Sequence, residues 1–287
     1  MRPEELLALI KLIEDPDEIV FEAVSKRLIE AGSSVVAELE RQWTVDSSPL
    51  LNDRILNLVR EIQFNATCSN LKAWYENDYH NLLEGLLIVS SYQYPEMNRQ
   101  LILEKYARIE QAVWLELNNE ITALEQVKVL NHILFKVNKF GNSKTPYSPE
   151  NYFINQVIDT QKGNSMSLAL LYMVVANKLG IPLGGVNLLG NYILAYVDQN
   201  AFKTNYDKIT HNEILFYINP YNKGAVLGKR EIDIYLTERK QEILDKFYIP
   251  VDNRVIIKQL LDDLIFAYGE IGYTHKADEI KKMMDML

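Results

Sequence analysis

The sequence predicts an α+β fold, in which an N-terminal α-helical array precedes a small antiparallel sheet packed on a central helix, and a helical hairpin follows. Three observations predict it. Apolar residues recur at helical spacing through the first 140 residues. The stretch 163–196 indicates a buried helix, a tight turn and two strands. Helical spacing then returns over residues 254–287.

Residues 1–76 form the predicted helical array. A first helix over Pro3–Glu14 ends at residues 15–17, where Asp-Pro-Asp stops it and places proline in the first turn of the next helix. Gly32 is placed to end that second helix, and a third follows it. A fourth helix is expected over Pro49–Ile62. The pattern is faintly HEAT-like, but without a clean period it predicts an array of short antiparallel helices.

Residues 77–245 form the predicted core. Three longer helices lead to a connector at residues 140–149 that is rich in turn residues. A Gly-Asn-Ser turn at residues 163–165 then opens the apolar run Met166–Ala176, which predicts a buried helix. This helix is the element on which we expect the sheet to pack.

The strands of the core follow that helix. Two hydrophobic segments broken at Gly190-Asn191 predict a pair of strands. The polar segment Gln199–Asn212 predicts a loop or hairpin tip, and Ile214–Ile218 predicts another strand that ends at Asn219-Pro220. A short helix at Lys229–Leu236 closes the core.

Residues 246–287 form the predicted C-terminal hairpin. Helices over Arg254–Ile271 and Thr274–Leu287 are joined at Gly272. The pair resembles a tetratricopeptide-like hairpin.

Composition narrows the classes of function. The chain has 287 residues, of which 48% are hydrophobic, and a formal net charge of −9. This charge repels nucleic acids and anionic membrane surfaces, and no basic cluster offsets it. Cys68 is the only cysteine, so a reducing compartment fits, and Glu4, Glu5 and Lys11 interrupt the apolar stretch that a signal peptide would need. We expect a cytoplasmic protein that binds neither nucleic acid nor membrane.

Residues 163–219 carry a family resemblance. The order GNSMSLALLYMVVANKLG, two short strands and ILFYINPYNKG resembles the catalytic core of SirB-type transglutaminase-like proteins. The segments Phe140-Gly141-Asn142, Tyr147 and Asn151–Ile158 extend the resemblance back to about Asn77. The family places a cysteine at the start of the helix, a histidine on the next strand and an acid on the strand after. The matching positions are Ser165, Asn191 and Asn219.

The chemistry that the resemblance implies is missing at two of these positions. A cysteine at a helix N-terminus forms a thiolate because the helix dipole lowers its pKa, and a histidine takes its proton. A serine hydroxyl depends on a base even more, yet Asn191 has no titratable group to act as one. Asn219 is the least damaged position, since asparagine orients the imidazole in papain-like enzymes. We therefore expect no catalytic residue at these three positions.

Each of the three residues also has a structural interpretation. Ser165 is placed to be a helix N-cap, Asn191 follows Gly190 in a tight turn, and Asn219 before Pro220 is typical of a turn initiator. An alternative base is His211, which stands just before the strand that carries Asn219. The other three histidines are expected on helix surfaces (His80, His132, His275).

Three functional hypotheses follow. The first is a catalytically inactive transglutaminase-like protein that acts as a cytoplasmic binding or scaffolding module, with another protein or a peptide as its partner. The second is a hydrolase or acyltransferase with Ser165 as nucleophile and His211 as base. The third places the function on a surface of the helical array. No metal-ligand spacing, P-loop or dinucleotide fingerprint occurs, so no cofactor or metal is expected.

Overall fold

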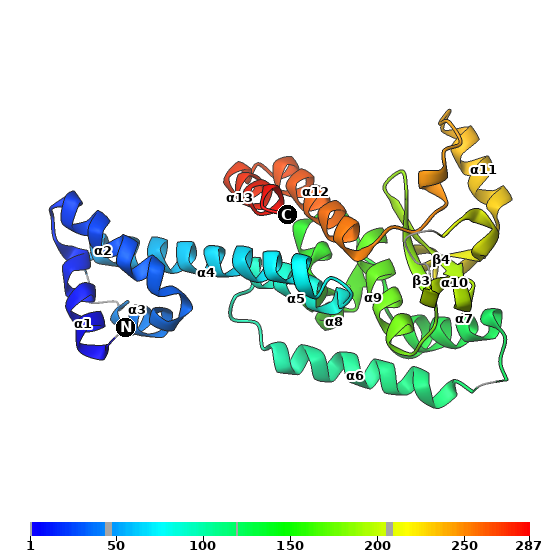
Figure 1. The fold of residues 1–287 in the computed structure, drawn as a ribbon, viewed down its shortest axis with the longest axis horizontal. Helices are drawn as coiled ribbons and strands as arrows, with labels where there is room; N and C mark the ends of the chain where they lie inside the picture. The colour runs from blue at the N-terminus through cyan, green and yellow to red at the C-terminus, as the bar shows by residue number, and fades with distance from the viewer. Residues whose placement is uncertain (1, 44–47, 119, 205–208) are drawn as a thin grey trace.

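The computed structural model describes residues 2–43, 48–118, 120–204 and 209–287. The molecule is elongated, with the N-terminal helices at one end and the sheet at the other (Figure 1). Helices α1 (Pro3–Lys11), α2 (Glu18–Ala31) and α3 (Val36–Gln42) pack with the first half of α4 (Pro49–Asn77) around their own hydrophobic cluster. We call this unit the N-terminal arm.

Arg54 of α4 is buried within the arm and binds the segment that connects α1 and α2. Its side chain is buried and donates from one nitrogen to the carbonyl oxygens of Ile13 and Asp15, both at 2.7 Å. Its other terminal nitrogen pairs with Glu18 at 2.6 Å, and the guanidinium lies 4.0 Å from the centre of the Phe21 ring. The planar fork of arginine therefore closes the turn between α1 and α2.

Helix α4 is longer than predicted, because it continues past Ile62 to Asn77. Residues 65–70, Asn-Ala-Thr-Cys-Ser-Asn, include several polar residues typical of a helix end, but the apolar spacing resumes with Leu71 and Trp74, which are buried in the main core. The hydrophobic cluster thus changes within one continuous helix, between Ile62 and Cys68.

A cavity of about 450 Å³ lies beside this change of cluster. Its lining includes Glu40 of α3, Arg60 of α4, Glu96 after α5, and Lys276 of α13. Residues of the arm and of the C-terminal helices therefore face the same space.

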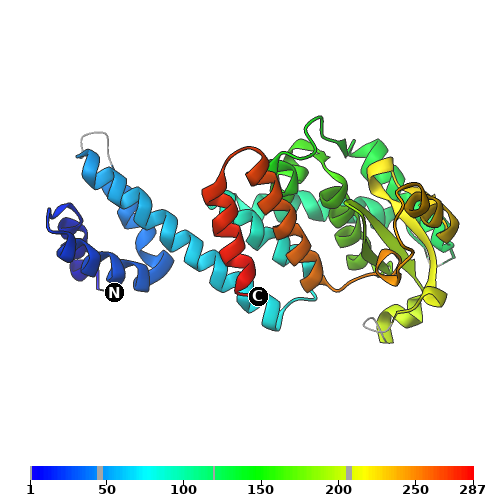
Figure 2. The same ribbon diagram turned by 90° about the horizontal axis from the view of Figure 1, so that it is seen from above.

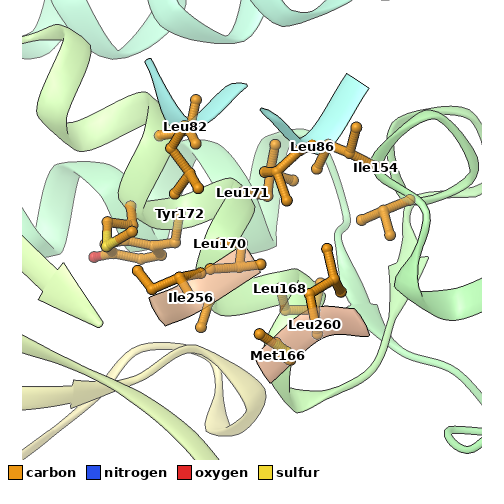
Figure 3. Packing of buried hydrophobic residues seen from close by; sticks show 14 of the residues in the cluster. Leu82, Leu86, Ile154, Met166, Leu168, Leu170, Leu171, Tyr172, Ile256 and Leu260 are labelled. Carbon is orange, nitrogen blue, oxygen red and sulfur yellow. The ribbon is translucent and has the colours of Figure 1, made fainter. Parts of the chain in front are cut away.

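The main core is built around one buried helix. Helix α9 (Ser165–Lys178) is buried from Met166 to Ala176, and Figure 3 shows its side chains meeting those of the helices around it. Gly85 of α5 lets Trp74 approach, since a Cβ there would lie 2.7 Å from the indole ring. The surrounding helical segments are α5 (Leu82–Gln93), α6 (Arg99–Glu116), α7 (Ala123–Asn131), the π-helical turn η3 (His132–Val137), η4 (Pro149–Tyr152) and α8 (Ile154–Thr160).

The sheet has four antiparallel strands in the order β3-β4-β5-β6. Alternate residues of β4 face opposite sides, so Tyr192, Leu194 and Tyr196 join the main core, while Ile193 and Ala195 join a second cluster beneath α11. A two-stranded parallel pair, β1 with β2, precedes α9. The strands are β1 (Gly141–Asn142), β2 (Lys162–Gly163), β3 (Leu183–Leu188), β4 (Asn191–Val197), β5 (Ile214–Asn219) and β6 (Ala225–Leu227).

The segment between β4 and β5 differs from the predicted loop. It contains a short helix, α10 (Gln199–Thr204), and the turn η6 (His211–Glu213). Asp198 accepts the N–H groups of Asn200 and Ala201 and thereby starts α10, a polar signal that is equally typical of a loop.

The C-terminal helices pack back on the core. After η7 (Pro220–Asn222), α11 (Lys229–Glu238) and η8 (Asp245–Phe247), helix α12 (Asn253–Glu270) lies beside α13 (Thr274–Asp285) (Figures 1 and 2). Ile256 and Leu260 of α12 reach the α9 side chains in Figure 3. The predicted α+β class, with helices at both ends of the chain and a sheet packed on a central helix, is confirmed.

Candidate functional site

The N-terminus of α9 is capped by Asn164, so the expectation that Ser165 is the N-cap is wrong. Asn164 Oδ1 accepts the N–H of Ser167 at 2.9 Å, and Ser167 Oγ accepts the N–H of Asn164 at 3.0 Å. This reciprocal capping box satisfies two backbone donors. Because Asn164 performs the capping, the Ser165 hydroxyl one residue later is directed elsewhere.

The Ser165 hydroxyl contacts the backbone of β4. Its Oγ accepts the N–H of Tyr192 at 2.8 Å and lies 3.4 Å from the Tyr192 carbonyl oxygen. The ladder between β4 and β5 stops at the pair Leu194–Ile218, so this hydroxyl takes the place of a strand partner for Tyr192. Ser165 thus joins the helix to the sheet.

Asn191 and Asn219 also make structural contacts. Asn191 is the first residue of β4, directly after the two-residue turn Leu189-Gly190, and its Nδ2 donates to the Tyr235 hydroxyl of α11. Asn219 Oδ1 accepts the N–H of Asn222 at 3.1 Å and begins the turn η7. Both amides therefore point to partners other than Ser165.

His211 lies at the opposite end of β5 from Asn219. The six residues of the strand separate them by about 20 Å at roughly 3.3 Å per residue. His211 Nε2 lies 2.8 Å from Asp245 Oδ1, and the ring meets Tyr248 edge-on. The structure does not bring His211 to the Ser165 hydroxyl.

A small pocket of about 120 Å³ opens at the start of α9, where Ser165 and Asn191 both line it. Over the part of the chain that the structure describes, no histidine, lysine or arginine lines this pocket. Its remaining lining consists of Pro146, Tyr147, Tyr152, Asn164, Met166, Gly190, Tyr221 and Asp263. We call it the α9 pocket.

The arrangement of a helix N-terminus facing strands in an antiparallel sheet is the one that the family resemblance implies. The model of the transglutaminase-like superfamily matches residues 100–262, which is more than half of the chain. The chain belongs to this superfamily. Within it, the expected SirB-type relationship is confirmed by the relatives.

Those relatives are distant in sequence. A UPF0162 protein of Xylella fastidiosa is 24% identical over 76% of this chain and 74% of its own length. Protein SirB1 of Salmonella typhimurium is 21% identical, over 64% of this chain and 65% of its own. F-box only protein 21 of the mouse is 24% identical over 76% of this chain, which spans only 38% of that protein. The comparison with solved structures finds no match.

Asp263 lines the α9 pocket but was not predicted from the sequence as a site residue. Burial, reinforced by the neighbouring charge of Asp262, raises the pKa of the Asp263 carboxyl to about 6. A signal was present in the sequence, because Asp263 falls on the buried stripe of α12 with Ile256, Leu260 and Ala267. An acid on an apolar helix face marks either a partner or a site.

Other reactive groups lie away from the pocket. Cys68 is buried and unpaired, and burial raises the pKa of its thiol to about 11. In the described ranges, no cluster of three or more histidine, cysteine or acidic side chains could hold a metal ion. No helix among the described residues is long and apolar enough to cross a membrane.

Proposed function

We propose that this protein is a catalytically inactive member of the transglutaminase-like superfamily, which acts as a cytoplasmic binding or scaffolding module. Its partner is a protein or a peptide, and the α9 pocket holds one group of that partner. The scaffold of the family then serves to recognise a partner and not to catalyse a reaction.

The contact of Ser165 with the Tyr192 backbone carries the proposal. A serine nucleophile needs a base within about 2.6–3.2 Å of its hydroxyl, or one water away. Here the hydroxyl accepts a backbone N–H at 2.8 Å and lies against the carbonyl of the same residue. These contacts favour a hydroxyl that fixes a strand to a helix. The amides of Asn191 and Asn219 support the same interpretation, since each has a structural partner.

A serine-directed fluorophosphonate tests the proposal on the full chain. We expect wild-type protein to remain unlabelled at neutral pH, as Ser165→Ala does, because among the described residues the Ser165 hydroxyl hydrogen-bonds to the Tyr192 backbone and to no base. Labelling is measured by the mass of the intact protein. Labelling of the wild type that disappears in Ser165→Ala would contradict the proposal and favour the hydrolase.

Two further variants identify the base in that case. Loss of labelling in His211→Ala would support the base expected from the sequence. Loss of labelling in Asp263→Asn would instead assign this role to the acid that lines the same pocket as Ser165.

A further inference from the structure

The α9 pocket has one end that offers hydrogen-bond donors. Asn164 is only 5% exposed, and its Oδ1 is used in the capping box. The Tyr152 hydroxyl lies close enough to interact with the Asn164 side chain, yet Nδ2 has no partner in hydrogen-bond geometry among the described residues. A buried amide N–H without a partner destabilises the folded state, so this donor is suited to a ligand oxygen.

The first turn of α9 adds to the donor end. The leading N–H groups of an α-helix have no intrahelical acceptor, and the helix dipole makes this end positive. Ser165 and Met166, the first two residues of this 14-residue helix, both line the pocket. A carbonyl or carboxylate oxygen therefore fits at this end.

Asp263 gives the pocket an acidic group. In the described chain, no hydrogen bond or ion pair satisfies its carboxylate, and its charged neighbour Asp262 has the same sign. The other titratable groups that line the pocket are the phenols of Tyr147, Tyr152 and Tyr221. Burial raises the pKa of Tyr152, so this phenol stays neutral near pH 7. A cationic group of a ligand would be the missing counter-ion.

We propose that the α9 pocket binds an α-ammonium group together with its adjacent carbonyl, as found at the amino end of a peptide or in a small free amino acid. The ammonium pairs with Asp263, and the oxygen accepts from Asn164 Nδ2 and the first turn of α9. A volume of about 120 Å³ accommodates the ammonium, the carbonyl and a small side chain. This inference rests on the proposed binding function and names the chemistry of its ligand.

Alaninamide is the first probe, because it carries both groups and no negative charge. Titration of the full chain, followed by NMR chemical shifts of ¹⁵N-labelled protein, should show saturable binding. N-acetylalaninamide lacks the ammonium and should bind at least tenfold more weakly. Equal binding of the two would overturn the proposal, as would the absence of binding by both alaninamide and alanine.

Asp263→Asn and Asp262→Asn form a matched pair on the same helix. The first variant should lose at least tenfold in affinity for alaninamide, whereas the second, whose side chain is exposed, should bind like the wild type. Wild-type affinity should also fall as the pH drops below about 6, where Asp263 becomes protonated, and Asp263→Asn should lack this dependence. Wild-type affinity in Asp263→Asn would refute the pairing.

Asn164→Ser tests the donor end. Serine keeps an N-cap oxygen for α9 but removes Nδ2, so the melting temperature should change little while affinity falls several-fold. Unchanged affinity in folded Asn164→Ser would contradict the assigned role of Nδ2.

Alanine separates the two sources of the ligand. Tighter binding of alanine than alaninamide would identify a free amino acid, and the reverse would identify a peptide end. Failure of this inference is distinct from failure of the proposed function. Absence of probe binding leaves the fluorophosphonate result as it stands, whereas labelling at Ser165 removes the inactive assignment whatever the probes do.

Discussion

At the scale of single residues, Asp263 links the pocket to the stability of the protein. Its folded pKa of about 6 lies above its ordinary value near 3.8, so the folded state binds the proton more tightly than the unfolded state does. The contribution of Asp263 to the stability of the protein is therefore greatest below the ordinary pKa and falls as the pH rises through about 6. At neutral pH the ionised Asp263 carboxylate therefore lowers the free energy of unfolding.

Asp263→Asn should remove this destabilisation, because asparagine carries no charge to bury. We expect the variant to be more stable than the wild type at pH 8, by about 1–3 kcal/mol, with the gain disappearing near pH 4. Denaturant unfolding at the two pH values measures it, and Asp262→Asn is the control because that side chain is exposed. A gain of the same size at both pH values would disagree with a desolvated carboxylate.

The reactivity of a thiol at position 165 can be compared with that of the native thiol, Cys68. Wild-type protein should react very slowly with iodoacetamide at pH 7, because its one thiol is buried and has a pKa of about 11. Ser165→Cys places a thiol at the N-terminus of α9, where the helix dipole favours the thiolate. Its alkylation should be at least tenfold faster than that of the wild type, measured by intact mass. Equal rates would mean that the pocket is closed to the reagent.

At the scale of elements, Asn131 connects α7, α9 and the turn before β6. Its Nδ2 donates to the Gly224 carbonyl at 2.9 Å, and its Oδ1 accepts from the Tyr172 hydroxyl at 3.0 Å. Gly224 has φ of 76°, and a Cβ there would lie 1.7 Å from Asn131 Oδ1. The turn therefore requires glycine both for its conformation and for its close approach.

Gly224→Ala should destabilise the protein by roughly 2–4 kcal/mol, since it combines a left-handed alanine with a displaced, partly buried hydrogen bond. Gly272→Ala is the matched control, because its φ of 78° is similar but no atom lies within 4 Å of the added Cβ. The control should lose only about 1 kcal/mol. Thermal unfolding distinguishes them, and equal losses would refute the steric argument.

At the scale of the whole molecule, the arm and the main core have separate hydrophobic clusters that share α4. The division of the chain at residues 76 and 245 stays a prediction. We expect the arm to open without the core. Arg54→Lys cannot reproduce the forked contacts to Ile13, Asp15 and Glu18, and should lower the protection of α1–α3 by roughly 2 kcal/mol.

Hydrogen exchange measures this local loss. Amides of α9 and β4 should keep their wild-type protection in Arg54→Lys, and Arg60→Lys, an exposed position on the same helix, should change neither region. Equal loss of protection in α9 would contradict independent opening of the arm.

Much of the architecture was predictable because it depends on local patterns. The apolar run after Gly163 and the Gly190 turn place α9, β3 and β4 correctly. The continuation of α4 was not predictable, since its polar middle is stabilised by tertiary packing on both sides. The capping role of Asn164 was missed for a similar reason, because two neighbouring polar residues fit the same cap and only the fold chooses between them.

Only the pocket residues that belong to the central helix and the sheet could be predicted from the sequence. Ser165 and Asn191 could be placed there through the family resemblance, whereas Asp263 comes from a helix about 100 residues later in the sequence. Nothing local relates α12 to α9. Asn219 and His211 are the opposite case. They are close in sequence, but the extended strand β5 lies between them and keeps them apart in the structure.

Because α4 is one continuous helix, a small bend within it would move the whole arm relative to the core. Its 29 residues extend about 43 Å at 1.5 Å per residue, and the arm is mounted on one half of this rod. Thr67, near the middle, donates its hydroxyl to the Gln63 carbonyl, a contact that often bends helices. A tilt of about 5° at Thr67 would move the start of α4, which lies 18 residues or about 27 Å away, by about 2 Å. Because Glu40 of the arm and Lys276 of α13 line the same cavity of about 450 Å³, such a tilt would also change the width of that cavity.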